Sequence, residues 1–199
     1  MSRRLLSLAA VVLVGALSAG CADDVAPAAR IGDRTVTTEQ LLSEADQWAQ
    51  SPTLLAQLQV ATVAGAGEGS YDTAFVGFLL TNRISFELHN AQFQELGLAL
   101  SDEERANVRA GLFPDPAVSQ AVFAELGGPY GERLVDDVAR QFAVSQAMGE
   151  GYDAWRVEVL TSDDIKINPR YGSWDARTAQ LLPPAGPRPA PGADLFTGL

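Results

Sequence analysis

The sequence is poor in the residues that most often carry catalysis or bind metals. It has one cysteine, Cys21, and one histidine, His89. A disulfide within the chain needs a second cysteine, and a structural zinc site normally takes four Cys or His ligands. Ser85 lies four residues before His89, but a pair on one helix face offers no oxyanion hole. We therefore predict no catalytic site, no cofactor and no metal, and a His89 in the core or at its boundary with one hydrogen-bond partner.

Positive charge is also scarce. The chain has 14 Lys and Arg against 25 Asp and Glu, which gives a formal net charge of −11 at pH 7. Nucleic acids and anionic lipid surfaces bind basic surfaces, so neither is expected to bind this chain by charge. Acidic residues cluster at 102–104, Asp136-Asp137 and Asp163-Asp164. None of these clusters has the alternating oxygen spacing of a calcium loop, and they are predicted to be solvated charge.

Long hydrophobic runs are missing except at the N-terminus. Leu5–Leu17 is apolar apart from Ser7 and Gly15 and follows two arginines. A transmembrane helix needs roughly 20 residues, whereas a run of about a dozen is the size of a signal-peptide core. Small residues at 18–20 then lead to Cys21.

This arrangement resembles a bacterial lipoprotein signal, with Ser18 where that family most often has Leu. The resemblance implies that residues 1–20 are a signal peptide and that Cys21 is lipidated. The lipid would anchor the chain to the cell membrane, facing the extracytoplasmic side. An ordinary secretory signal that happens to contain a cysteine is the alternative.

The remaining chain divides into a tether, a domain and a tail. We expect a lipidated tether at 21–29, a helical domain at 30–175, and a disordered tail at 176–199, which is rich in proline. The domain is predicted to be mainly α, with five to seven helices around one core. A strand or hairpin near 30–36, with a turn at Gly32-Asp33, is expected to pair with a strand at 165–167. This two-stranded sheet would join the two ends of the domain.

Periodicity and caps predict where the helices lie. They are expected over about 39–50, 53–65, 71–96, from Ser101 onward, over 117–126 and over 132–148, and 152–160 is either a short helix or an extended link. In the long helix the predicted buried stripe is Phe75, Leu79, Asn82, Phe86, His89, Phe93 and Leu96. Gly97 is expected to end that helix.

Four segments occur in an order typical of one family. They are "RIGDRTVTTEQL", "FLLTNRISFELHNAQFQELGLALSDEE", "YGERLVDDVARQFAVSQAM" and "DIKINPRYGSWD". Together they resemble the chaperone module of SurA-like and parvulin-type foldase lipoproteins, over roughly residues 30–175, and "INPRYGSWD" looks most like the actinobacterial type. The prolyl isomerase domain of that family has no room here, because residues 151–164 join the last helix directly to the last strand. The resemblance therefore implies the chaperone part alone, without catalysis.

Such modules bind unfolded or exported polypeptides in apolar clefts between helices. The candidate client-binding residues are Phe75, Phe78, Phe86, Phe93, Phe123, Tyr130 and Phe142, although each is also a possible core residue. One alternative function is a scaffold or accessory subunit that docks on a specific cell-envelope partner, with Leu195 and Phe196 of the tail as anchors. A residual prolyl isomerase is the least favoured alternative.

Overall fold

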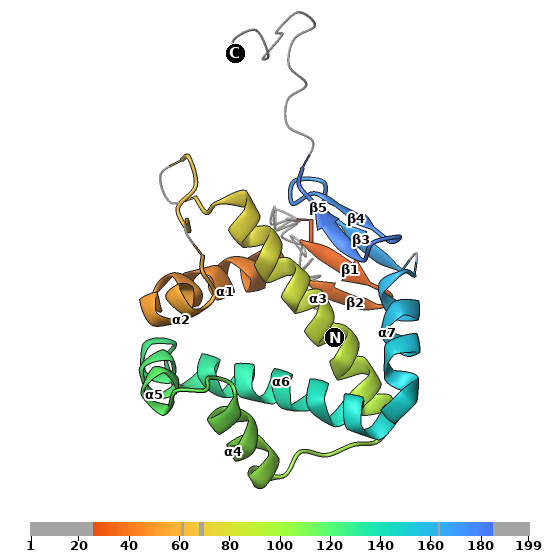
Figure 1. Cartoon of the computed structure of the whole chain (residues 1–199). Coiled ribbons are helices and arrows are strands. Elements are labelled where there is room, and N and C mark those ends of the chain that lie inside the picture. The colour runs from red at the N-terminus through yellow and green to blue at the C-terminus, as the bar shows by residue number, and fades with distance from the viewer. Residues whose placement is uncertain (1–25, 61, 68–69, 163, 185–199) are drawn as a thin grey trace, which may run out of the picture.

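The computed structural model describes residues 26–60, 62–67, 70–162 and 164–184 (Figure 1). Cys21, Leu195 and Phe196 lie outside the described residues. The described chain is mainly helical with a small antiparallel sheet, which confirms the predicted fold class at that level. No helix within the described ranges is long and apolar enough to cross a membrane.

The helices follow the predicted order. They are α1 (Thr38–Ala49), α2 (Pro52–Gln57), α3 (Thr73–Glu95), α4 (Asp102–Gly111), α5 (Pro116–Glu125), α6 (Gly128–Met148) and α7 (Tyr152–Leu160), with a 3-10 turn at Gly149–Gly151 before α7. Both α1 and α4 begin with a capping box, formed by Thr37 with Gln40 and by Ser101 with Glu104. The helix start predicted at Ser101 is thereby confirmed.

The helix predicted over 53–65 is much shorter than expected. It ends at Gln57, and Gln59 has a positive φ of 55°. The residues after it include the β-branched Val60, Thr62 and Val63, which lose side-chain freedom in a helix. The chain instead crosses to α3 through an isolated bridge between Ala64 and Tyr71.

The first sheet joins the two ends of the domain, as predicted, but it has three strands rather than two. Its strands are β1 (Ala29–Ile31), β2 (Arg34–Val36) and β3 (Ile165–Ile167), in the order β2-β1-β3 and all antiparallel. The extra strand arises because Gly32, with a φ of 59°, folds the first segment back on itself. Left-handed backbone of this kind favours glycine.

A second hairpin extends the domain beyond the predicted boundary at residue 175. Strand β4 (Ser173–Asp175) pairs with β5 (Gln180–Leu182), so ordered structure continues into the segment that was assigned to the tail. A Cβ on Gly77 of α3 would lie 3.4 Å from Leu181, which shows how closely this hairpin approaches the helix. At the other end Ala28 and Ala29 are buried, so the predicted tether is also shorter than 21–29.

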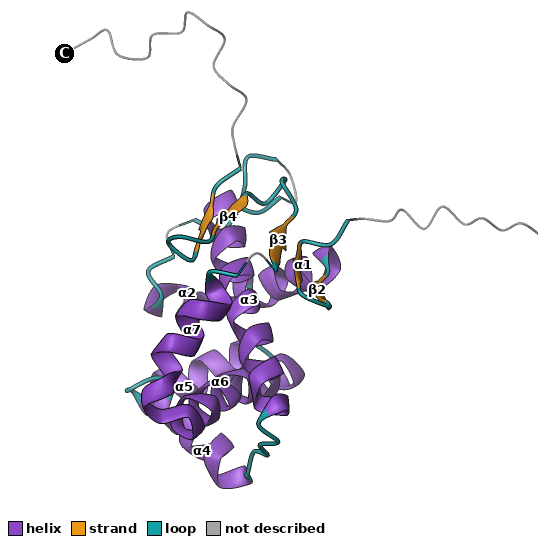
Figure 2. Ribbon diagram, turned by 90° about the vertical axis from the view of Figure 1, so that its right-hand side faces the viewer, coloured by secondary structure: helices purple, strands orange, loops and turns teal. Residues whose placement is uncertain are grey.

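Helix α3 runs through the middle of the domain (Figures 1 and 2). The sheet covers one side of α3, and α1 and α6 pack on its other sides. Leu79, Leu80 and Ile84 of α3 are fully buried. In the sequence, the residues of the main core cluster run from Ala28 to Tyr171. A shortened chain that starts at residue 22 therefore keeps all of them.

Candidate binding site

The candidate aromatic residues divide by exposure. Phe75, Phe93 and Tyr130 are buried, so in this structure they expose almost no surface that a client could contact. Phe75 and Tyr130 belong to the main core cluster, and Arg140 of α6 lies over the Phe93 ring.

Phe86 and Phe123 are half-buried and already have partners. Phe86 packs against the core, and the Arg83 guanidinium lies 5.5 Å from its ring centre. Phe123 makes an edge-to-face contact with Phe113, and Arg109 lies over its ring. These two rings therefore offer little free surface to a client.

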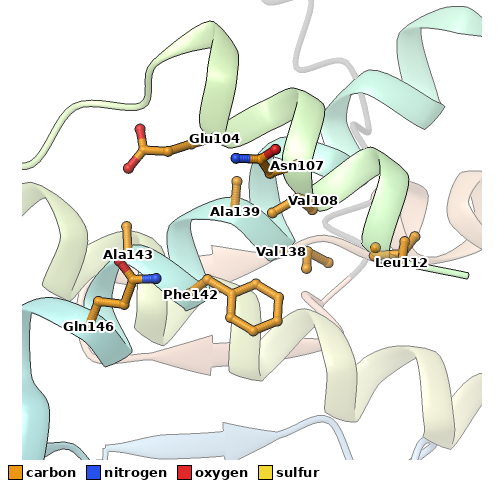
Figure 3. Close-up of a pocket in the computed structure, with 10 residues that line it drawn as sticks. Glu104, Asn107, Val108, Leu112, Val138, Ala139, Phe142, Ala143 and Gln146 are labelled. Carbon is orange, nitrogen blue, oxygen red and sulfur yellow. The ribbon is translucent and has the colours of Figure 1, made fainter. Parts of the chain in front are cut away.

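Phe142 is the most exposed of the candidates, at 57%, and it lies in a groove between α4 and α6 (Figure 3). The groove has a volume of about 450 Å³. Its lining is mostly aliphatic and aromatic, with three polar side chains. The lining residues are Glu104, Asn107, Val108, Gly111, Leu112, Val138, Ala139, Phe142, Ala143 and Gln146.

Two ion pairs fasten α4 to α6 beside the groove. Arg105 donates to Asp136 at 2.8 Å, and Arg109 pairs with Glu132. On α6 Asp136 and Val138 point in nearly opposite directions, because two residues advance a helix by slightly more than half a turn. No residue of α4 is buried, so this helix is covered only in part by α6 and α5.

Phe78 marks a second hollow, beside the C-terminal hairpin. Its side chain is 39% exposed and contacts Trp48 edge to face, with 5.7 Å between ring centres. The hollow holds about 380 Å³ between the first half of α3 and the region of Leu181 and Pro183. The two exposed candidates therefore belong to separate surfaces rather than to one continuous cleft.

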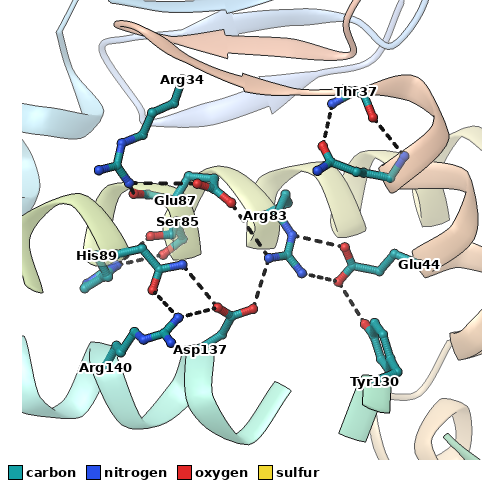
Figure 4. Close-up of polar contacts among 12 residues, drawn as sticks. Arg34, Thr37, Glu44, Arg83, Ser85, Glu87, His89, Tyr130, Asp137 and Arg140 are labelled. Atoms are coloured by element: carbon teal, nitrogen blue, oxygen red, sulfur yellow. Dashed lines mark hydrogen bonds and ion pairs between the residues drawn. The ribbon is translucent and has the colours of Figure 1, made fainter. Parts of the chain in front are cut away.

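A buried ionic network holds α6 against α1 and α3 (Figure 4). Arg83 of α3 donates two hydrogen bonds to Glu44 of α1, at 3.1 and 3.2 Å, and one to Asp137 of α6, at 3.0 Å. Tyr130 donates to Glu44 at 2.8 Å. Burial alone would lower the pKa of Arg83, but Glu44 and Asp137 more than offset it and raise that pKa. The α6 wall of the groove is thereby fixed to the rest of the domain.

This network corrects the prediction that Asp137 is solvated charge. Its side chain is only 2% exposed and also accepts from Asn90 at 3.1 Å. Asp136 is half-exposed and pairs with Arg105 and Arg140. The two neighbours differ because adjacent helical positions point in different directions, and Asp137 points toward α3.

His89 is buried in the core, as predicted, but it has two partners rather than one. Its Nδ1 lies 2.6 Å from the carbonyl oxygen of Ser85, and its Nε2 lies 2.9 Å from the Tyr152 hydroxyl. A carbonyl only accepts, so Nδ1 carries the proton and Nε2 accepts from Tyr152. The Ser85 hydroxyl is 3.5 Å from Nδ1. Because Nδ1 already carries a proton, it cannot act as a base that activates this hydroxyl.

The burial of His89 predicts a stability that falls at acid pH. Burial lowers its pKa from the ordinary value of 6.5, the Ser85 carbonyl opposes this, and Arg156 adds to it. The unfolded chain therefore binds the proton more readily, so His89's contribution is complete above pH 6.5 and is lost as the pH falls below it. We expect the denaturation midpoint to drop between pH 7.5 and 5.5, and to drop less in His89→Gln. Equal drops in the two proteins would contradict this.

The described residues provide no metal site, since no three or more His, Cys, Asp or Glu side chains among them are grouped to hold an ion. The chain matches no family model, no curated protein and no solved structure. The strongest feature for binding is thus the α4/α6 groove with Phe142, whose α6 wall the ionic network connects to α1 and α3.

Proposed function

We propose that the protein is a membrane-anchored lipoprotein with a SurA-like chaperone module, which holds unfolded or exported polypeptides on the extracytoplasmic side without catalysis. The anchor is the lipid on Cys21, and the α4/α6 groove is the site where client segments bind. The observation that carries the proposal is Phe142, a large aromatic side chain left 57% exposed inside an apolar groove.

The groove has the properties that loose binding of unfolded chains needs. An exposed apolar surface attracts apolar side chains without requiring one sequence. The α6 wall does not have to be ordered on binding, because α6 is already tied to α1 and α3 through Arg83. A prepared site loses less conformational entropy when a client binds.

Suppression of aggregation tests the proposal. We would dilute a chemically unfolded client into solutions of the chain that starts at residue 22 and follow light scattering. Near-stoichiometric suppression is expected. Burying a phenylalanine contributes roughly 1.5–3 kcal/mol, so Phe142→Gln should require about tenfold more protein for the same effect.

Val157→Gln is the matched control. Val157 is 62% exposed on α7 and does not line the groove, so this variant should act like the wild type. Circular dichroism and thermal unfolding should show that both variants keep the fold. A folded wild-type chain that does not suppress aggregation would overturn the holdase function and favour docking on one specific envelope partner.

A further inference from the structure

We propose that the α4/α6 groove selects amphipathic helical segments that carry a cationic side chain at the end of the groove where Glu104 lies. The inference rests on the proposed function, because it names the class of polypeptide that the same groove binds. It is carried by the shape of the groove and by the charge on its lining.

The shape of the groove suits a third helix. Arg105 pairs with Asp136, and Arg109, one turn further along α4, pairs with Glu132, one turn back along α6. The two helices therefore run antiparallel. A groove between two such helices accepts the apolar face of a third one, whose side chains at i, i+3, i+4 and i+7 enter it.

The apolar part of the lining sets what enters. Val108 and Leu112 come from α4, and Val138 and Phe142 come from α6. In Figure 3 the Phe142 ring lies beneath Val108 and Val138, and Leu112 lies toward one end of the groove. With a volume of about 450 Å³, the groove has room for a few large apolar side chains from one helix face, and not for a folded surface.

Charge distinguishes one end of the groove from the other. Among the described residues that line it, Glu104 carries the only charge, and Figure 3 shows it at the opposite end from Leu112. One carboxylate oxygen of Glu104, Oε2, accepts from the backbone N–H and the hydroxyl of Ser101, both at 2.7 Å. The hydrogen bond from the Ser101 backbone N–H is the larger cause, and the one from its hydroxyl the smaller, of a lowered pKa of Glu104. The carboxylate is therefore ionised at neutral pH.

The carboxylate is also held in place, since Ser101 and Glu104 form the capping box that begins α4. A cation on the incoming helix would find a fixed partner there, whereas an acidic residue would meet like charge. The net charge of the whole chain, −11, acts in the same direction. Charge complementarity therefore favours basic amphipathic segments over acidic ones.

Fluorescence anisotropy with labelled peptides tests this inference. The first peptide places Leu and Phe at i, i+3, i+4 and i+7 with Lys at the polar positions. The second has Glu in place of Lys, and the third has the same composition as the first without helical spacing. With the chain that starts at residue 22 at low salt, we expect the basic peptide to bind about threefold more tightly than the acidic one, as an exposed ion pair allows.

Two adjacent substitutions separate the groove from general charge. Glu104→Gln removes the charge but keeps the capping box, because Gln also serves at this position. It should reduce the preference for the basic peptide to the level that the net charge of the chain alone gives. Glu103→Gln removes the same charge one residue away, on an exposed side chain that does not line the groove, and it should keep the preference. The spaced peptide should also bind more tightly than the unspaced one.

The outcomes distinguish this inference from the proposed function. Equal binding of basic and acidic peptides, or equal effects of the two substitutions, would overturn the charge selection. Equal binding of the spaced and unspaced peptides would overturn the helical part. Either result leaves suppression of aggregation standing. Peptide selection without any suppression would instead overturn the holdase function and support this site as a recognition groove.

Discussion

Replacing Arg83 with methionine is expected to lower the free energy of unfolding by about 3–5 kcal/mol, because it removes the cation that compensates two buried carboxylates. The side chains of Glu44 and Asp137 are 3% and 2% exposed. Neither can turn to solvent, and each loses a hydrogen-bonded cation at close range. Urea denaturation followed by circular dichroism measures the loss.

Arg105→Met is the matched control for this prediction. Arg105 also pairs with an acidic residue of α6, but its side chain is 37% exposed. Exposed pairs contribute between about 0 and 1 kcal/mol, so the control should change little. Combining Arg83→Met with Glu44→Gln and Asp137→Asn should recover part of the loss, since neutral amides leave no buried charge. Similar losses for Arg83→Met and Arg105→Met would show that burial does not set the strength of the network.

Local signals in the sequence were sufficient for much of the fold. The Ser101 capping box, the turn at Gly32-Asp33 and the strand at 165–167 each depend on residues close in sequence, and the structure contains all of them. The pairing of the two ends of the domain was also predicted, and the structure contains it. The hairpin of β4 and β5 was missed because the proline-rich composition beyond it hid a short strand, and the strand depends on contact with α3.

The ionic network was missed for a different reason. Glu44 and Asp137 lie 39 and 54 positions from Arg83 in the sequence, and no periodicity connects them. One signal was present: Arg83 is the only charged residue of α3 between Thr73 and Phe86, and a charge on a helix that is buried needs a partner. The sequence did not say which carboxylates would supply it.

The candidate site was predicted only in part. Phe142 was among the candidates, but its neighbours Val108, Leu112 and Val138 were not, because the groove depends on how α4 packs against α6. The aromatic criterion also selected Phe75 and Phe93, which are buried. An apolar stripe indicates which face of a helix is buried, but not which residues along that face stay exposed.

Leu80→Ala is expected to lower the free energy of unfolding by about 2–5 kcal/mol. Leu79→Ala should lower it by as much, although only Leu79 lies on the predicted buried stripe. The reason is that α3 is surrounded: Leu79 and Leu80 point in different directions on the helix, and both are fully buried. Removing either side chain leaves a cavity that a packed neighbourhood does not fill. Denaturation in urea gives both values on the same scale.

Leu96→Ala is the control from the same stripe. Leu96 belongs to the predicted buried face but is 41% exposed at the end of α3, so its replacement should cost about 0.5 kcal/mol or less. The order of the three losses then separates two descriptions of α3. If one face carried the packing, Leu96→Ala would cost more than Leu80→Ala. If α3 is the central helix, with the sheet on one side and α1 and α6 on the others, Leu80→Ala costs severalfold more than Leu96→Ala.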